Sequence, residues 1–499
     1  MKRKVMIICL LIISLALCSC KEPIKIEIPV GEKITEDFKV NSYFNNNAII
    51  QANSTISITG VSEEGVVMIA SIYDSKGELI SQNYGIATLD NTFSIAINTP
   101  NASTKNYKLE IKDSFDTFIH TYTNIKFGQV WLINKNVLSV VELPEENKEN
   151  LLNQNIGYYY VNKTMSSWDN SEIITSYVRN LANKIYQEHK SIISNDIPIG
   201  IIVIDTEDTY LFEWISKNKI DRAKFVKDYL IKENLYDNEI VSNLYEKVLS
   251  PLEGIKISGY IWHYSEKDAS FSLGEDYSLV YSILINFLTN YFCDTFGENI
   301  KKVFVQNPTS ENEKINELRS HQMIMSYYFS NSYLIPTYDL NVKYDEELEK
   351  NFIVEIDQTK LIKRIIDIVF EGKRPSGYSK LVSLYNDKGE LTKISIYISN
   401  TDKLICKEMN FLNIYDNEGN LIELNYVIKN NVIEIDLEIP VLEEEVVDVQ
   451  DGNENIEPIE KQYYQISRIE YEALKEKGGN WLYNEENIPV LPFIIEVGK

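Results

Sequence analysis

Apolar and polar residues alternate with a period of two in several short segments between residues 44 and 127. Turn-forming residues, such as Ser75, Lys76 and Gly77, separate these segments. Short alternating strands with turn residues between them are typical of a β-sandwich. The pattern therefore predicts a β-sandwich domain over residues 44–127, with strands at 55–59, 66–73, 92–97 and 107–111.

The pattern changes after Gly128, where short apolar runs bounded by polar residues appear at 200–204 and 302–305. Such runs are typical of strands buried on both faces of a parallel sheet. Helical periodicity surrounds them, at 173–186, 277–296, 315–329 and 359–370. Alternating strands and helices favour a doubly wound α/β domain over residues 128–374.

Alternation with a period of two returns after residue 374, as in 391–398 and 432–439. We therefore expect a β-rich C-terminal domain over residues 375–499. Residues 443–460 are acidic and rich in turn formers, and we interpret them as a solvated excursion rather than a cation site.

The first residues have the pattern of an export signal. Met1-Lys2-Arg3-Lys4 is followed by a short apolar run and then by Leu17-Cys18-Ser19-Cys20. This end resembles the lipobox of bacterial lipoproteins, with Cys20 as the lipidated residue. We expect residues 1–19 to be a signal peptide and 20–43 to be a tether. The protein is then secreted and lipid-anchored to a bacterial membrane, periplasmic or surface-exposed. An ordinary cleaved signal with incidental cysteines is the alternative.

Composition narrows the function classes further. The 499 residues include 49 Lys and Arg against 74 Asp and Glu, a formal net charge of −25. A nucleic-acid partner is therefore not expected, because binding to phosphates needs cationic surface. Beyond the signal and Cys20 only Cys293 and Cys406 remain, and we expect buried thiols rather than a disulfide.

Five blocks in order along the chain carry a resemblance to a known family. They are 128–132 (GQVWL), 197–201 with Thr209 and Trp214, 259–262 (GYIW) through Glu266 to Ala269, 316–322 (NELRSHQ), and 482–484 with 488–493. Residues 44–51 with Gly60 add a sixth, upstream. Together they resemble the bacterial sialate O-acetylesterase family, which are carbohydrate esterases. The resemblance implies an SGNH-hydrolase-like doubly wound parallel sheet between the two β-rich regions.

The catalytic residues of that family are not found at the matching positions. Counting on from Trp131-Leu132 places Val137 at the nucleophilic serine, and counting back from Lys363-Arg364 places Phe352 and Val354 at the aspartate and the histidine. Ester hydrolysis by such a triad needs a hydroxyl nucleophile, a base and an orienting carboxylate. The sequence therefore predicts a lost triad, with Val137 and Val354 close together over the strand ends.

Two other arrangements of polar residues remain open. Ser139 and His263 could form a relocated nucleophile–base pair, or be a surface serine and a hydrogen-bonded histidine. The resemblance also implies that the glycine pair near the oxyanion has become Glu207-Asp208. Together with Asp205 these acids could bind a divalent cation. We favour instead a helix cap by Asp208 or Thr209, and expect neither a metal nor a cofactor.

Three functions follow from the resemblance. The first is a non-catalytic binding or structural lipoprotein whose ligand is a glycan or an acetylated sugar, with Thr209, Trp214, Trp262 and Glu266 as remnants of the pocket. The second is an active carbohydrate O-acetylesterase with a relocated site. The third is a surface scaffold for a protein partner, with the old pocket filled.

Overall fold

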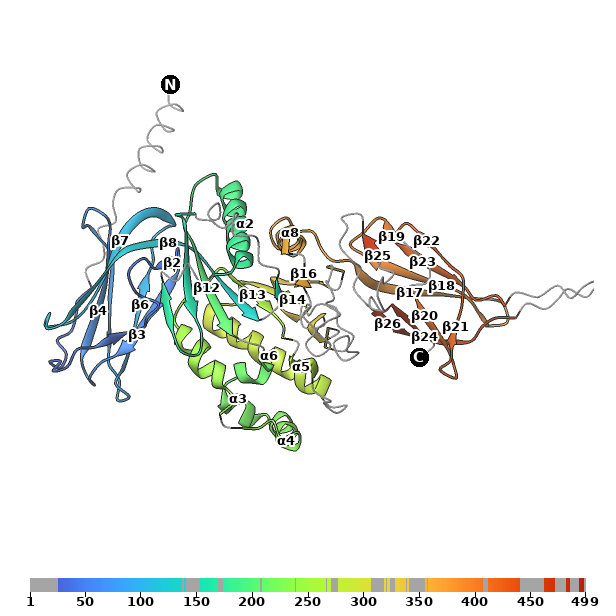
Figure 1. Ribbon diagram of the computed structural model, residues 1–499, viewed down its shortest axis with the longest axis horizontal. Coiled ribbons are helices and arrows are strands. Elements are labelled where there is room, and N and C mark those ends of the chain that lie inside the picture. The colour runs from blue at the N-terminus through green and yellow to red at the C-terminus, as the bar shows by residue number, and fades with distance from the viewer. Residues whose placement is uncertain are drawn as a thin grey trace, which may run out of the picture.

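The structure is a computed structural model, shown in Figure 1. It describes residues 26–136, 139–140, 153–168, 174–206, 209–237, 239–265, 267–270, 277–306, 318–319, 321–323, 328–337, 339–340, 355–356, 358–406, 412–439, 462–471, 482–484 and 493–497. Cys20 and the expected signal peptide lie outside these residues.

The N-terminal region is a β-sandwich built from alternating strands. Three strands form one sheet: β1 (Lys39–Val40), β3 (Thr55–Val61) and β6 (Thr92–Asn98). The facing sheet contains β2 (Ile49–Gln51), β4 (Val67–Tyr73), β5 (Leu79–Ile86), β7 (Ser103–Asp113) and the first half of β8 (Ile119–Asn136). Ile34 and Phe38, in the segment expected to be a tether, are buried in its core. Apolar side chains at these positions hold that part of the segment against the sandwich.

Strand β8 belongs to both the sandwich and the α/β domain. Its first half pairs with β7 and β2, and its second half pairs in parallel with β12 (Ile199–Thr206) and β13 (Gly259–His263). Gly128 lies where the partners change, and a Cβ atom there would lie 1.9 Å from the carbonyl oxygen of Pro198. Only glycine allows the two strands to approach this closely.

The centre of the α/β domain is a parallel sheet with strand order β10-β12-β8-β13-β14-β15. The strands not yet given are β10 (Ile156–Val161), β14 (Lys301–Val305) and β15 (Ser332–Ile335), and β11 (Ser166–Trp168) adds an antiparallel edge. Buried apolar residues fill both faces of these strands, as expected for a parallel sheet with helices on either side.

Helices cover both faces of this sheet (Figure 1). Helices α2 (Ser176–Ile193) and α8 (Gln358–Val369) pack on one face. The other face carries η4 (Leu211–Trp214), α3 (Lys217–Arg222), α4 (Lys224–Lys232), η5 (Tyr245–Leu249), η6 (Ser250–Leu252), α5 (Lys267–Ser270) and α6 (Tyr277–Phe296). A mixed α/β fold with several sheets is thus confirmed.

The C-terminal region has a separate apolar core between two four-stranded antiparallel sheets. One contains β17 (Gly377–Tyr385), β18 (Leu391–Ser399), β23 (Val432–Asp436) and β22 (Tyr426–Lys429). The other contains β21 (Leu421–Ile422), β20 (Asn413–Asp416), β24 (Ile466–Tyr471) and β26 (Phe493–Glu496). A short pair, β19 (Leu404–Cys406) and β25 (Leu482–Asn484), completes the region.

Two findings bear on the expectations about cysteines and membranes. Cys293 is a free, partly buried thiol on α6. Among the described residues, no helix combines the length and the apolar character needed to cross a bilayer.

Candidate functional site

The candidate site lies at the carboxyl ends of β8, β12 and β13, where an open parallel sheet normally binds its ligand. Val137, Phe352 and Val354, which the resemblance matches to the triad, lie outside the described residues. The residues just beyond them are described. Strand β9 (Ser139–Val140) pairs in parallel with β16 (Glu355–Ile356), and Ser139 is the register partner of Glu355. The fold therefore brings these two segments together from opposite ends of the α/β domain.

His263 ends β13 at this edge and is 2% exposed. Its Nδ1 lies 2.9 Å from the backbone carbonyl oxygen of Asn134, and its Nε2 lies 2.9 Å from the hydroxyl of Tyr177. The side chain of Asn134 also accepts a hydrogen bond from the backbone N–H of His263 and donates one to its carbonyl oxygen, over 2.6 Å and 3.0 Å. Both ring nitrogens of His263 are therefore engaged inside the protein.

These partners determine the proton position on the imidazole. A carbonyl oxygen only accepts, so Nδ1 carries the proton and donates it to Asn134, and Nε2 accepts from the hydroxyl of Tyr177. Burial lowers the pKa of His263 to about 4, because the charged imidazolium would lose its hydration. The ring is therefore neutral near pH 7, and its Nε2 lone pair is occupied.

The other three histidines have partners of their own. His120 contacts Asp37 in the sandwich, at 3.0 Å, and stacks on Phe38. His189 is on α2 beside Trp131 and Phe370, and burial lowers its pKa to about 4. The Nδ1 of His321 lies 2.6 Å from the hydroxyl of Ser282 on α6. All four histidines of the chain are described, so His263 is the one histidine at the end of β13.

A relocated Ser139–His263 pair would require His263 to lose its hydrogen bond with Tyr177. Ser139 is described only through its backbone pairing with Glu355. For the Nε2 of His263 to accept a proton from any serine, the hydrogen bond from Tyr177 must break first. In the described geometry both ring nitrogens of His263 are already hydrogen-bonded.

The remnants of the pocket lie in the core. Trp214 and Trp262 are each 1% exposed and pack edge to face with their ring centroids 5.0 Å apart. A ring buried in this way offers no face to a sugar. The hydroxyl of Thr209, also buried, accepts a hydrogen bond from the indole N–H of Trp214 over 3.0 Å.

The predicted helix cap by Asp208 or Thr209 is wrong, because the helix begins later in the chain. Helix η4 begins at Leu211, and Tyr210 is its N-cap, with the side chain of Glu213 accepting a hydrogen bond from the Tyr210 backbone N–H over 2.9 Å. Thr209 lies one residue before this N-cap, and its hydroxyl accepts the hydrogen bond from the Trp214 indole.

The acidic residues show no arrangement for a cation where they are described. Asp205 accepts a hydrogen bond from Tyr160 over 3.0 Å. Glu207, Asp208 and Glu266 lie outside the described residues. Within the part of the chain that the structure describes, no group of three or more Asp, Glu, His or Cys side chains is placed to hold a metal ion.

Asn134 and Tyr177, which hold His263, were not among the predicted site residues. A signal for Asn134 was present, since it is a polar residue directly after the apolar run 130–133, at the same sheet edge as His263. No comparable signal marked Tyr177, because it comes from the first turn of α2, 86 residues before His263 in the chain.

Comparison with known proteins gives a fold and no family. No family model and no curated protein matches the chain. The chain is similar in structure to a carbohydrate acetylesterase from Xanthomonas citri, with a TM-score of 0.68 and 13% sequence identity, over 93% of this chain and 100% of that one. A β-glucuronidase from Bifidobacterium dentium matches with a TM-score of 0.28 and 8% identity, over 68% of this chain and 57% of that one. The chain therefore has a carbohydrate-esterase-like fold.

Proposed function

We propose that this chain is a non-catalytic binding or structural protein with the fold of a carbohydrate acetylesterase, attached to a bacterial membrane through a lipid on Cys20. The ligand class proposed for it is a glycan or an acetylated sugar, because the structural neighbour is a carbohydrate acetylesterase. The doubly wound SGNH arrangement and the closeness to sialate O-acetylesterases are part of the same proposal.

The observation that supports the loss of catalysis is the state of His263. An acyl-transfer site needs a base whose lone pair faces the nucleophile. The lone pair of His263 faces Tyr177, the ring is buried, and its pKa is lowered to about 4. His120 and His189 contact Asp37 and Trp131 elsewhere, and the Nδ1 of His321 is hydrogen-bonded to Ser282. With Val137 in place of the serine, both proton acceptor and nucleophile are missing at the positions that the resemblance predicts.

The test is an esterase assay of the mature chain on an aryl acetate and on acetylated sialic acid. We expect turnover no higher than that of a heat-denatured sample, because losing one member of a triad already lowers turnover by about 10⁴- to 10⁶-fold. Val137→Ser alone should restore nothing, since the new hydroxyl would have no base. Turnover that Ser139→Ala abolishes would contradict the proposal and support the relocated esterase.

Binding to a glycan array distinguishes a sugar-binding protein from a scaffold for proteins. Saturable binding of the mature chain to a defined glycan would support the ligand class proposed here. Its absence, together with the absence of turnover, would favour a scaffold.

A further inference from the structure

Six exposed apolar side chains gather at one end of the N-terminal β-sandwich, which we call the apolar end. Val30 and Leu89 are 82% and 81% exposed, and the other four are about half exposed. The set comprises Val30, Val61, Ile86, Leu89, Phe115 and Ile119. Exposed apolar side chains are ordinary when scattered, but a group of them indicates an interaction surface.

Backbone hydrogen bonds link the segments that carry these side chains. Ile86 is the register partner of Val67, and Val61 is the register partner of Thr92. Four bonds join the neighbouring loops: Ser62 N–H to Asn91 O, Gly65 N–H to Ala87 O, Ser114 N–H to Val67 O, and Glu32 N–H to Gly65 O, over 2.9–3.1 Å. The six side chains therefore belong to one end of the domain.

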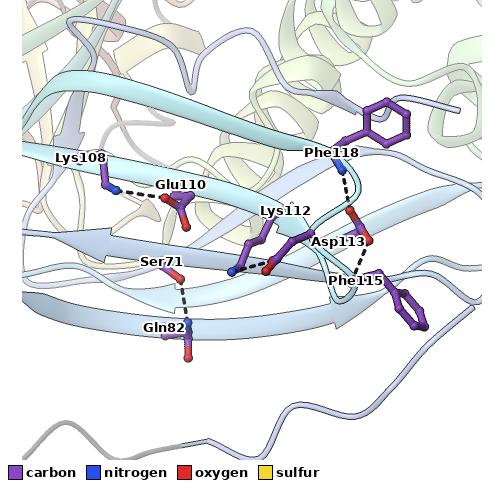
Figure 2. Close-up of polar contacts among 9 residues, drawn as sticks. Ser71, Gln82, Lys108, Glu110, Lys112, Asp113, Phe115 and Phe118 are labelled. Carbon is purple, nitrogen blue, oxygen red and sulfur yellow. Dashed lines mark hydrogen bonds and ion pairs between the residues drawn. The ribbon is translucent and has the colours of Figure 1, made fainter. Parts of the chain in front are cut away.

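Polar contacts fix the turn between β7 and β8 at the apolar end (Figure 2). The buried carboxylate of Asp113 accepts hydrogen bonds from the backbone N–H groups of Phe115 and Phe118, over 2.9 Å and 2.8 Å. Lys112 and Asp116 form an ion pair across the same turn at 2.8 Å. The turn is thus fixed by its own polar contacts while the ring of Phe115 remains 46% exposed.

The short distance along the chain from Cys20 to the apolar end indicates which surface this end contacts. Gly31 lies against Val67 at the apolar end, where a Cβ atom on it would be 2.7 Å from the Val67 backbone nitrogen. Ten residues lie between Cys20 and Gly31, and even when fully extended this stretch of eleven steps spans no more than about 40 Å. A lipid on Cys20, which is part of the proposed function on which this inference rests, would therefore keep the apolar end close to the bilayer.

The charged side chains at the apolar end determine which lipid headgroups it can contact. Glu32, Glu64 and Asp90 are exposed on the same loops, with Glu63 beside them. The cations there are Lys33 and Lys39, which are exposed, and Lys112, which is paired with Asp116. This excess of carboxylates opposes contact with anionic headgroups and leaves burial of apolar side chains as the driving force.

We infer that the apolar end is a second membrane contact, which inserts its apolar side chains among the headgroups of an uncharged phospholipid bilayer. It holds the β-sandwich against the membrane beside the lipid anchor. Neither acylation nor a protein partner is needed for this contact.

The test uses the mature chain with Cys20→Ser, which has no acylation site, and phosphatidylcholine vesicles in a sedimentation assay. We expect the chain to sediment with the vesicles and Val30→Ser/Leu89→Ser to bind at least about tenfold more weakly, because two of the most exposed apolar side chains are lost. The control is Leu384→Ser/Leu421→Ser, which changes two leucines of the C-terminal region that are 50% and 58% exposed and should leave binding unchanged. Adding phosphatidylglycerol should weaken binding, and salt should reduce that effect.

Equal binding of the Val30→Ser/Leu89→Ser variant, or no binding of the parent chain, would overturn the inference. Far-ultraviolet circular dichroism of each variant checks that the sandwich still folds. Failure of this inference can be told apart from failure of the proposed function, because fatty-acid labelling of Cys20 and the esterase assay can each succeed or fail whatever the unacylated chain does with vesicles.

Discussion

The two ring nitrogens of His263 have partners of different kinds. The bond from Nδ1 to the Asn134 carbonyl ties the end of β13 to β8, and the bond from Tyr177 ties β13 to the first turn of α2. A buried polar group that loses its partner retains the cost of its lost hydration. The hydrogen bond from Tyr177 should therefore contribute measurably to stability.

Tyr177→Phe is expected to lower the free energy of unfolding by about 1–3 kcal/mol, because the Nε2 of His263 is left buried without a donor. Tyr158→Phe is the matched control, since the hydroxyl of Tyr158 has no partner among the described residues and its loss should cost much less. Urea unfolding followed by tryptophan fluorescence measures both. Equal costs for the two variants would show that the hydrogen bond to His263 adds nothing.

Two buried histidines should make the protein sensitive to mild acid. The pKa values of His263 and His189 are lowered to about 4, mainly by burial, while an unfolded histidine titrates near 6.5. Between these values the unfolded chain binds the proton and the folded chain does not, so stability falls as the pH decreases from about 6.5 to about 4. For fully buried His263 the loss is up to about 3 kcal/mol.

His263→Gln should flatten this part of the pH dependence, because glutamine does not titrate. The urea midpoint, measured at intervals from pH 7.5 to pH 4, gives the comparison. His189→Gln provides a second variant in which a different titrating group is removed. A slope that neither substitution changes would mean that other groups cause the acid sensitivity.

At the scale of elements, the close approach of β8 and β12 depends on Gly128. Gly128→Ala places a Cβ atom 1.9 Å from the carbonyl oxygen of Pro198. This is a backbone atom, which cannot move away by a change of rotamer. We expect a loss of about 1–3 kcal/mol or more, as for other overpacked sites. Gly157→Ala is the control, because its nearest neighbour is the flexible end of the Ile49 side chain, at 2.9 Å. A smaller loss for Gly128→Ala than for Gly157→Ala would contradict this account.

Sequence periodicity located elements best where one pattern ran without interruption. The apolar positions of α6 predicted Tyr277–Phe296, the bounds that the structure has. Strand β5 was missed because Ser81, Gln82 and Asn83 interrupt its alternation. Two of these polar side chains bond to neighbouring strands: Gln82 donates to Ser71 of β4 over 2.8 Å (Figure 2), and Asn83 donates to the carbonyl oxygen of Ala96 in β6.

The candidate site was less accessible to sequence reasoning than the fold. The sequence placed His263 at the end of a strand beside the resembling block, and the structure has it there. Its protonation and its partners could not be predicted, because they depend on Tyr177 of α2 and on Asn134 of β8, which tertiary packing brings together. Local patterns determine elements, whereas the contacts between elements determine the chemistry of a buried ring.

At the scale of the whole molecule, attachment through Cys20 remains a prediction. The basic start, the short apolar run and the small residue before Cys20 are its basis. Cys20→Ala is expected to move the protein out of the membrane fraction and to abolish incorporation of labelled fatty acid. Retained labelling in that variant would show that Cys20 is not the modified residue.

Strand β8 joins the apolar end to the candidate site as one continuous length of backbone. Its 18 residues, at about 3.3 Å each, have a contour length on the order of 60 Å, with an irregularity at Asn124, whose φ is 58°. Tension between a membrane contact and a ligand at the edge that holds Asn134 would run along this strand, at right angles to its hydrogen bonds with β7 and β12. Under such a load the interstrand hydrogen bonds of β8 would share the force instead of breaking one after another. The strand would therefore transmit force between its two ends.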